Sequence, residues 1–156
     1  MTPTPRVRPA TPADASAIAA LTAANDDQRA TPAHIADHIA HRARFETPYV
    51  AELDGAVVGL ACLRLLPALC DPVPYAELTE LVVAPAHRRR GVGRALVRHI
   101  ESVARDGGAT ELVLITAWRN TRAHAFYHAL GYGLYTLTMR RSLQGNRSAS
   151  PPEWGI

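Results

Sequence analysis

The stretch that decides the fold is a run of eighteen residues near the middle of the chain, Glu77-Leu78-Thr79-Glu80-Leu81-Val82-Val83-Ala84-Pro85-Ala86-His87-Arg88-Arg89-Arg90-Gly91-Val92-Gly93-Arg94. Its first half belongs to a mostly apolar run, 75–83, that is typical of a β-strand and ends before a proline. The residues after the loop carry apolar side chains at spacings near four, which predicts a helix that ends at Gly107-Gly108. The sequence therefore places a basic, glycine-containing loop between a strand and the start of a helix.

Outward from this run, the sequence predicts strands and helices on both sides. Before it we expect a strand at 6–9, helices that begin at Thr11 and Thr31, and two strands at 48–53 and 56–66 joined by the hairpin signal Asp54-Gly55. After it we expect a strand at 111–116, a helix at 121–130, and one or two strands in 133–141. The order β-α-α-β-β-β-α-β-α-β-β predicts an α/β fold, a mixed β-sheet flanked by helices.

Length and composition favour one globular domain. The chain has 156 residues, of which 47% are hydrophobic and 20% charged, as is usual for globular proteins. We expect the domain to span 1–143 and a flexible tail to span 144–156. No apolar run is long enough to cross a membrane, and the N-terminus lacks the apolar centre of a secretory signal. These features predict a cytoplasmic protein without a membrane partner.

Charge and metal-ligand patterns exclude further classes. The formal charge is +3 and all seventeen basic residues are arginine, which is too weak a bias to predict a nucleic-acid partner. Cys62 and Cys70 are too few for a disulfide framework or a metal site. The helix face formed by His34, His38 and His41 has helical spacing, but a polar surface is the better interpretation, so no metal is predicted.

The loop itself can bind an anion on physical grounds. Backbone N–H groups at the start of a helix are unpaired and carry partial positive charge, which favours phosphate. Gly91 and Gly93 allow a ligand to approach the backbone, and Arg88 and Arg90 add guanidinium donors. The loop is not a Walker loop, since no Gly-Lys-Ser/Thr follows, and it lacks the third glycine of the dinucleotide motif, where Leu96 stands instead.

Two motifs resemble those of a known family. Arg88-x-x-Gly91-x-Gly93 is similar to the acetyl-CoA signature of the GNAT (Gcn5-related N-acetyltransferase) superfamily, Arg/Gln-x-x-Gly-x-Gly/Ala. Asn120-x-x-Ala123-x-x-Phe126-Tyr127-x-x-x-Gly131-Tyr132 resembles the second conserved motif of that family. The predicted element order is also that of the family, and the resemblance covers about residues 5–143.

The resemblance implies an acetyl-CoA-dependent N-acetyltransferase. Acetyl would pass directly to a primary amine of a small molecule or a peptide, through a tetrahedral intermediate. The strand residues Leu81, Val82 and Val83 would pair with the pantetheine arm, and an N–H near Val83 would stabilise the oxyanion. The pyrophosphate would lie on the loop formed by Arg88, Arg89, Arg90, Gly91, Val92, Gly93 and Arg94. Asn120 would hydrogen-bond the cofactor arm, and Tyr127 would protonate the departing thiolate.

Two carboxylates are candidates for the base that takes the proton of the amine. Glu77 and Glu80 are three residues apart, so a regular strand would turn them to opposite faces unless a bulge intervenes. Many relatives use a water relay, in which case neither is essential. The acidic turn Asn25-Asp26-Asp27-Gln28 would border the acceptor site and could attract a cationic amine.

Two alternative functions and the oligomeric state remain open at this point. The domain could bind CoA without catalysis, as a sensor or partner module, although the intact Tyr127 and loop argue against this. The arginine run, with Arg94 and Arg98, could bind nucleic acid, although few aromatic residues interleave with it. A homodimer is conceivable through the strand edge expected at 133–141.

Overall fold

The structure is a computed structural model and describes residues 4–24, 30–141 and 143. It divides into two compact units, Met1–Arg119 and Asn120–Ile156, and each is described by itself. The first unit contains the sheet, the helices that cover it and the arginine loop. The second contains the helix with the second motif.

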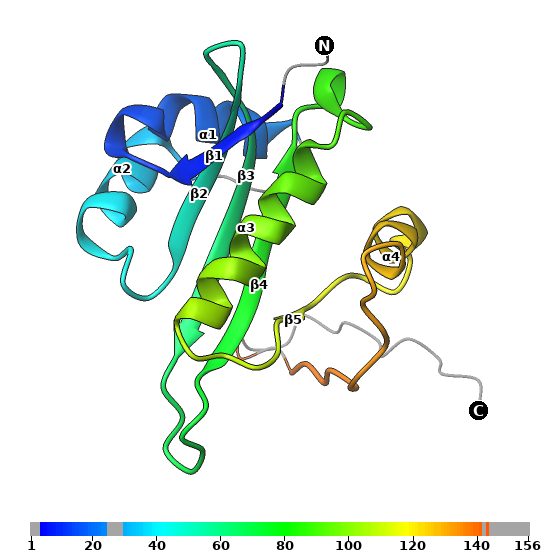
Figure 1. The fold of residues 1–156 in the computed structure, drawn as a ribbon. Coiled ribbons are helices and arrows are strands. Elements are labelled where there is room, and N and C mark those ends of the chain that lie inside the picture. Colours follow the sequence, from blue (N-terminus) through cyan, green and yellow to red (C-terminus); the bar gives the residue numbers. More distant parts are fainter. Residues whose placement is uncertain (1–3, 25–29, 142, 144–156) are drawn as a thin grey trace. The chain divides into compact units, whose positions relative to one another are not determined.

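The sheet of the first unit has five strands in sequence order: β1 (Arg6–Pro9), β2 (Thr47–Leu53), β3 (Ala56–Leu66), β4 (Tyr75–Val83) and β5 (Val113–Leu114) (Figure 1). The first four strands pair antiparallel, and β5 pairs parallel to β4. This mixed sheet confirms the predicted fold class. Asp54 and Gly55 both have positive φ, at 52° and 79°, as a tight two-residue hairpin requires.

Three helices cover the sheet. Helices α1 (Ala15–Ala23) and α2 (Pro32–His41) lie on one face, and α3 (Val92–Asp106) lies on the other (Figure 1). Short 3₁₀ turns, η1 (Pro12–Asp14) and η2 (Pro85–His87), precede α1 and follow β4. The predicted start at Thr31 is confirmed, because its side chain accepts a hydrogen bond from the His34 N–H at 3.2 Å. Thr11 forms a capping box with Asp14 at the start of η1.

Each face of the sheet has its own core. Ile18 and Leu21 of α1 pack with Val50, Leu60 and Val82 from the strands. On the opposite face, α3 contributes four fully buried side chains, those of Val92, Leu96, Val97 and Ile100. Gly59 of β3 makes this contact possible, because a Cβ there would lie 2.9 Å from Leu96 Cδ1 and 3.0 Å from Val92 Cγ1. The start of α3 is thus held tightly against the middle of the sheet.

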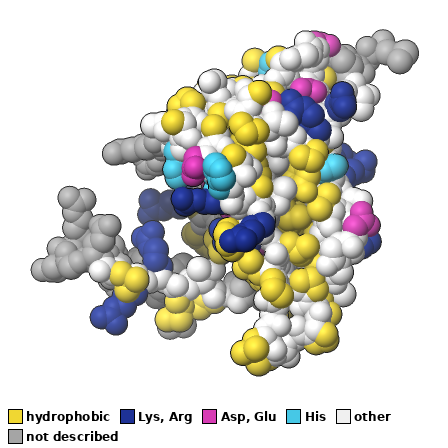
Figure 2. All heavy atoms as spheres, turned by 90° about the vertical axis from the view of Figure 1, so that its left-hand side faces the viewer, with side chains coloured by type: hydrophobic (Ala, Val, Ile, Leu, Met, Phe, Trp, Pro, Cys, Tyr) yellow, Lys and Arg dark blue, Asp and Glu magenta, His cyan; other side chains and the backbone are white. Residues whose placement is uncertain are grey.

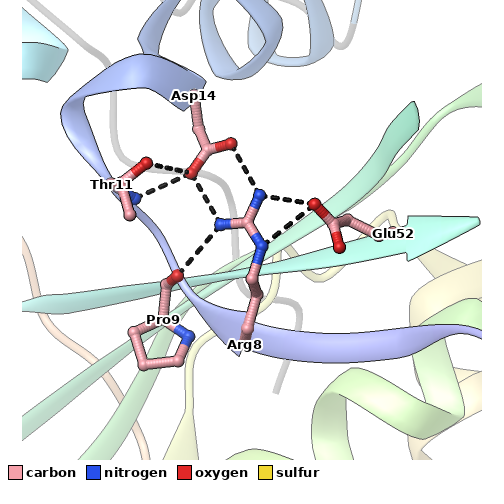
Figure 3. Close-up of polar contacts among 5 residues, drawn as sticks. All are labelled: Arg8, Pro9, Thr11, Asp14 and Glu52. Atoms are coloured by element: carbon pink, nitrogen blue, oxygen red, sulfur yellow. Dashed lines mark hydrogen bonds and ion pairs between the residues drawn. The ribbon is translucent and has the colours of Figure 1, made fainter. Parts of the chain in front are cut away.

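An ion-pair cluster fixes the edge strand β1 (Figure 3). The Arg8 guanidinium donates to both carboxylate oxygens of Asp14, at 2.8 and 2.9 Å, and to Glu52 Oε1, at 2.6 and 3.0 Å. Asp14 also accepts from the N–H and the hydroxyl of Thr11. The Arg8 guanidinium holds the pKa of Asp14 well below its usual range. The cluster therefore ties β1, the turn before α1, and β2 together.

The second unit departs from the sequence prediction. Helix α4 (Thr121–His128) begins at the predicted residue, follows the N-cap Asn120, and ends two residues before the predicted end at 130. Residues 133–141, however, form no strand, and their apolar side chains are exposed, including Leu134, Tyr135, Leu137 and Met139. The prediction of one or two strands there is wrong for this structure. An alternating pattern indicates only that a strand could form, whereas a strand also needs a partner for its backbone, and the sequence does not specify one.

Two further features bear on the predictions. Cys62 is buried and Cys70 exposed, and neither is in a disulfide. None of the helices in the described part of the chain combines the length and apolarity that crossing a bilayer requires. The predicted tail at 144–156 lies outside the described residues.

Candidate functional site

A β-bulge in β4 shapes the site. Leu78 is opposite Leu63, but Glu80 is opposite Cys62, so Thr79 is an extra residue in β4. Its hydroxyl donates to the Cys62 carbonyl oxygen at 3.3 Å. The parallel pairing with β5 reaches only Leu78, the residue before the bulge. This explains why β5 has two residues, not the six predicted at 111–116: the bulge bends β4 at the point where pairing would continue.

The second half of β4 therefore has an unpaired edge within the first unit. The Ala84 N–H donates to the Val58 carbonyl oxygen at 2.9 Å, toward β3. Because backbone groups alternate between the two sides of a strand, the N–H groups of Val83 and Leu81 point away from β3. No described strand of this unit pairs with them. An extended ligand could add to this edge as a strand does.

The bulge also decides how the two candidate carboxylates lie. Residues directly opposite each other in a sheet point to the same face, and so do residues two apart on one strand. Glu77 is opposite Arg64, Glu80 is opposite Cys62, and Cys62 and Arg64 are two apart. Glu77 and Glu80 therefore share one face, the one covered by α1 and α2. This is the arrangement that the sequence allowed only if a bulge was present.

Glu77 is held by an arginine. Arg64 Nη1 lies 3.2 Å from Glu77 Oε2, and Arg64 Nη2 lies 3.2 Å from Glu46 Oε1. Only 13% of the Glu77 side chain is exposed, compared with 40% for Arg64. Glu46 directly precedes β2, and His38 Nε2 of α2 lies 3.1 Å from its carbonyl oxygen. One guanidinium thus bridges two carboxylates that come from distant parts of the sequence.

Cys62 lies beside this group but does not act as a nucleophile. Burial raises the pKa of its thiol well above the usual range, and the charges of Glu46 and Glu80 raise it further. The thiolate is the reactive form of cysteine, so a thiol in these surroundings is inert. The same effect shows that Glu46 and Glu80 both lie near Cys62.

The start of α3 presents backbone donors without a side-chain cap. Gly91 occupies the N-cap position in the left-handed region, at φ 82°, and no side chain hydrogen-bonds the cap. The first helical hydrogen bond runs from the Ala95 N–H to the Gly91 carbonyl oxygen at 2.9 Å. The N–H groups of Val92, Gly93 and Arg94 therefore have no partner within the helix. Their partial positive charge suits an anion.

The arginines near the start of α3 differ in their contacts, backbone conformation and exposure. Arg88 Nε donates to the Val83 carbonyl oxygen at 3.2 Å, which fixes Arg88 at the end of β4. Arg89 has a positive φ of 61°, an uncommon conformation for a residue with a side chain. Arg89, Arg90 and Arg94 are exposed. Four of the predicted loop residues thus surround the helix start, and one of them also anchors the strand edge.

The second unit contains the other two predicted site residues. Asn120 caps α4, because its Oδ1 accepts from the Ala123 N–H at 3.1 Å. The Tyr127 ring packs against Phe126 and Tyr132, with centroids 5.1 and 5.7 Å apart. Burial raises the pKa of Tyr127 to about 12. The phenol is therefore protonated throughout the physiological pH range.

The remaining candidate sites are surface features. Histidine side chains lie beside an acidic side chain on the surface (Figure 2). On α2, His41 Nδ1 lies 3.1 Å from Asp37 Oδ1. No group of histidine, cysteine or acidic residues suited to a metal ion occurs among the described residues. The acidic turn at 25–28 lies outside them, so its proposed contact with the acceptor stays a prediction.

Comparison with known proteins identifies the family. The model of the acetyltransferase (GNAT) family matches residues 15–132. The chain belongs to this family. Aminoglycoside N(6')-acetyltransferase type 1 of Stenotrophomonas maltophilia is 33% identical over 136 residues, which cover 82% of this chain and 86% of that protein. N-acetyltransferase family 8 member 2 of Rattus norvegicus is 34% identical over 102 residues, 62% of this chain. The chain spans less than half of the length of that relative, 44%.

Solved structures share the fold. A structure from Agrobacterium tumefaciens str. C58 is 28% identical, with a TM-score of 0.78, and the match covers 88% of this GNAT chain and 99% of that one. An aminoglycoside N-acetyltransferase in complex with CoA gives a TM-score of 0.78 at 19% identity, covering 92% of this chain and 97% of the other. The second likeness shows the fold alone.

Sequence reasoning missed Arg64 and Glu46. Arg64 lies in the strand predicted at 56–66, but Glu46 lies before the strand predicted at 48–53, where the sequence assigned no element. The contact between them depends on the register of the strands. The register between β3 and β4 cannot be predicted from the sequence, because the length of the proline-rich loop between them does not indicate which residues of the two strands lie opposite each other. The pairing of Arg64 with Glu77 could not be read from their positions.

Proposed function

We propose that this GNAT protein is an acetyl-CoA-dependent N-acetyltransferase that acts on a primary amine of a small molecule. One observation carries the proposal. The unpaired edge of β4, at Leu81 and Val83, leads through η2 directly to the uncapped start of α3. A ligand with an amide-containing arm and a pyrophosphate needs a strand edge followed by an anion site, and acetyl-CoA is such a ligand.

These residues suit the acyl donor. The pantetheine amides would pair with backbone groups of Leu81 and Val83, and the N–H of Val83 would donate to the thioester oxygen, which gains negative charge during the reaction. The pyrophosphate would accept from the backbone N–H groups at the start of α3. Arg89, Arg90 and Arg94 would add charge around it. The side-chain amide nitrogen of Asn120 would hydrogen-bond the cofactor arm, since its Oδ1 caps α4.

The reaction requires the amine to lose a proton and the departing sulfur to be stabilised as a thiolate. The neutral amine nitrogen bonds to the acetyl carbon, the carbon–sulfur bond breaks, and its electron pair stays on sulfur. The amine loses a proton to a carboxylate, directly or through water. Glu80 suits this role better than Glu77. It directly precedes Leu81, whereas Glu77 lies four residues earlier, about 13 Å along a strand.

Tyr127 would act on the departing sulfur by hydrogen bonding. A thiol has a reference pKa of about 8.5, and burial raises the pKa of Tyr127 to about 12. Complete proton transfer from the phenol to the thiolate is therefore unfavourable. A protonated phenol can still donate a hydrogen bond to sulfur as its negative charge develops, which lowers the barrier without transfer of the proton.

The acceptor class follows from the relatives and the charges. Two of the similar proteins are aminoglycoside acetyltransferases by name, and aminoglycosides are cationic amines. Arg64 bonds two carboxylates, Glu46 and Glu77, and Glu80 lies on the same face of the sheet, so this group carries more negative than positive charge. We therefore expect a small polycationic amine, with a peptide amine as the second choice.

An enzymatic assay tests the proposal. Free thiol released from acetyl-CoA would be followed with sisomicin, with spermidine, and with a short peptide with a free N-terminus as acceptors. We expect release that depends on the amine and saturates with it. Binding of acetyl-CoA without release with any acceptor would favour a CoA-binding sensor domain. Tight binding of duplex DNA, lost as salt rises and unaffected by CoA, would favour the arginine run as a nucleic-acid site.

A further inference from the structure

The structure contains a charged group whose arrangement the proposed function does not explain. Two carboxylates, Glu46 and Glu77, bond the guanidinium of Arg64, and a third, Glu80, lies on the same α1–α2 face of the sheet opposite Cys62. Arg64 bonds two of them at the same distance, 3.2 Å. We propose that Arg64 is a positioning residue of the acetyl transfer, which holds Glu46 and Glu77 so that Glu80 takes the proton of the amine. The inference rests on the proposed function.

The geometry of Arg64 allows it to fix two carboxylates. A planar guanidinium has several donors in a fixed fork, so it can orient two carboxylates at once. Arg64 uses one terminal nitrogen for each. Because Glu77 is directly opposite Arg64 in the β3–β4 ladder, its backbone is fixed as well as its side chain. A carboxylate held in this way is poorly placed to turn toward a substrate.

Glu80 lies closer to the unpaired edge of β4 than Glu77 does. The bulge at Thr79 shifts Glu80 into line with Cys62, one pleat along from the Arg64–Glu77 pair and beside Leu81. Glu80 is thus the member of the trio nearest to the unpaired part of β4. The contacts that matter for this role are those of Glu46 and Glu77 with Arg64, and Glu80 can have other contacts of its own.

Arg64 also supplies the positive charge that these carboxylates need. Without Arg64, three carboxylates would share a partly buried face, and like charges at short range repel each other. Glu77 would be free to turn toward Glu80, and the proton of the amine would meet two competing acceptors in poor geometry. Glu46 has a second restraint, because His38 of α2 holds its backbone carbonyl at 3.1 Å. The effect of losing Arg64 should therefore pass mainly through Glu77.

Single substitutions test the division of roles among the carboxylates. Glu80→Gln should lower kcat by ~10²-fold, the lower end of the range for a positioned proton acceptor, with little change in the KM for acetyl-CoA. Glu77→Gln should change kcat by less than about fivefold, as for a partly exposed ion pair. Glu111→Gln, an exposed carboxylate on the approach to β5, is the matched control and should leave kcat unchanged.

A double mutant separates positioning from a purely structural role. Arg64→Met should lower kcat by about tenfold, and Arg64→Met/Glu77→Gln should return it to within about threefold of wild type, because coupled neighbours are not additive. Arg64→Lys keeps the cation and should restore part of the rate. Arg105→Met, an exposed arginine at the end of α3, is the control. Thermal melting of every variant would show which ones are folded.

The outcomes are distinct. The rates would be measured by thiol release with the fastest amine of the acceptor screen. The inference is overturned if Glu77→Gln is as slow as Glu80→Gln, or if the double mutant is no faster than Arg64→Met while both remain folded. A wild-type protein that releases no thiol with any amine overturns the proposed function itself, and the inference with it.

Discussion

Replacement of Arg8 by methionine should destabilise the fold and weaken its sensitivity to acid. The substitution keeps much of the length of the side chain but removes four hydrogen bonds to carboxylates and one to the Pro9 carbonyl oxygen. Asp14, whose side chain is only 9% exposed, would keep its bonds to Thr11 but lose its cation. The consequence should appear in the free energy of unfolding.

The magnitude follows from the burial of the cluster. Breaking a fully buried ion pair costs about 3–5 kcal/mol, whereas an exposed pair is worth about 0–1 kcal/mol. The side chains of Arg8 and Glu52 are each 24% exposed, which places this cluster between the two limits. We expect a loss of about 2–3 kcal/mol, which for a chain of this size lowers Tm by roughly 4–12 °C.

The pH dependence has a definite sign. The pKa of Asp14 is lowered in the folded protein, so its contribution to stability is present above its unfolded pKa of about 3.9. The contribution is lost as the pH falls from about 5 toward the folded pKa. In Arg8→Met, this part of the acid sensitivity should be missing.

Urea unfolding at pH 7 and pH 3 measures both effects. We expect wild type and Arg8→Met to differ clearly at pH 7 and to differ less at pH 3. Arg105→Met, which removes an exposed arginine outside any cluster, should match wild type at both. An equal loss of stability at the two pH values, or no loss at pH 7, would refute the reasoning.

Two further predictions concern the positions that support the site. Gly59→Ala should cost ~1–3 kcal/mol by overpacking, because its Cβ would meet Leu96 and Val92. Gly133→Ala, which adds a methyl group in open space, should unfold like wild type, and urea melts of both check this. Tyr127→Phe keeps the ring packing but removes a hydrogen-bond donor to the developing thiolate, which should lower kcat by roughly 10²-fold. Wild-type activity should show no loss from ionisation of Tyr127 up to pH 10, since its pKa is about 12. A small effect on kcat would remove Tyr127 from the mechanism.

Local signals predicted much of the fold. The threonine caps, the Asp54-Gly55 hairpin and the glycine loop before α3 depend on residues close together in sequence, so their structures could be read directly. The helix at Asn120 was found for the same reason. The length of β5 could not be predicted in this way, because the bulge at Thr79 in β4 determines where the pairing between β4 and β5 ends.

Contacts between distant segments could not be predicted. The strands expected at 133–141 had the right alternation but required a backbone partner that the sequence does not name. The candidate bases Glu77 and Glu80 were identified, yet their common face depended on a bulge, and the restraint of Glu77 depended on its register with Arg64. Sequence thus named the candidate groups of the site, whereas their arrangement in the structure depends on strand pairing.

The most direct test of the central claim is thermal melting with and without acetyl-CoA. A ligand that binds only the folded protein stabilises it by ~2.7 kcal/mol at a hundredfold excess over Kd, or roughly 5–10 °C in Tm for a chain of this size. We predict this shift for wild type and its loss in Gly91→Val, where a branched side chain would be strained at φ 82°. No shift of wild type with acetyl-CoA or CoA at millimolar concentration would contradict the account.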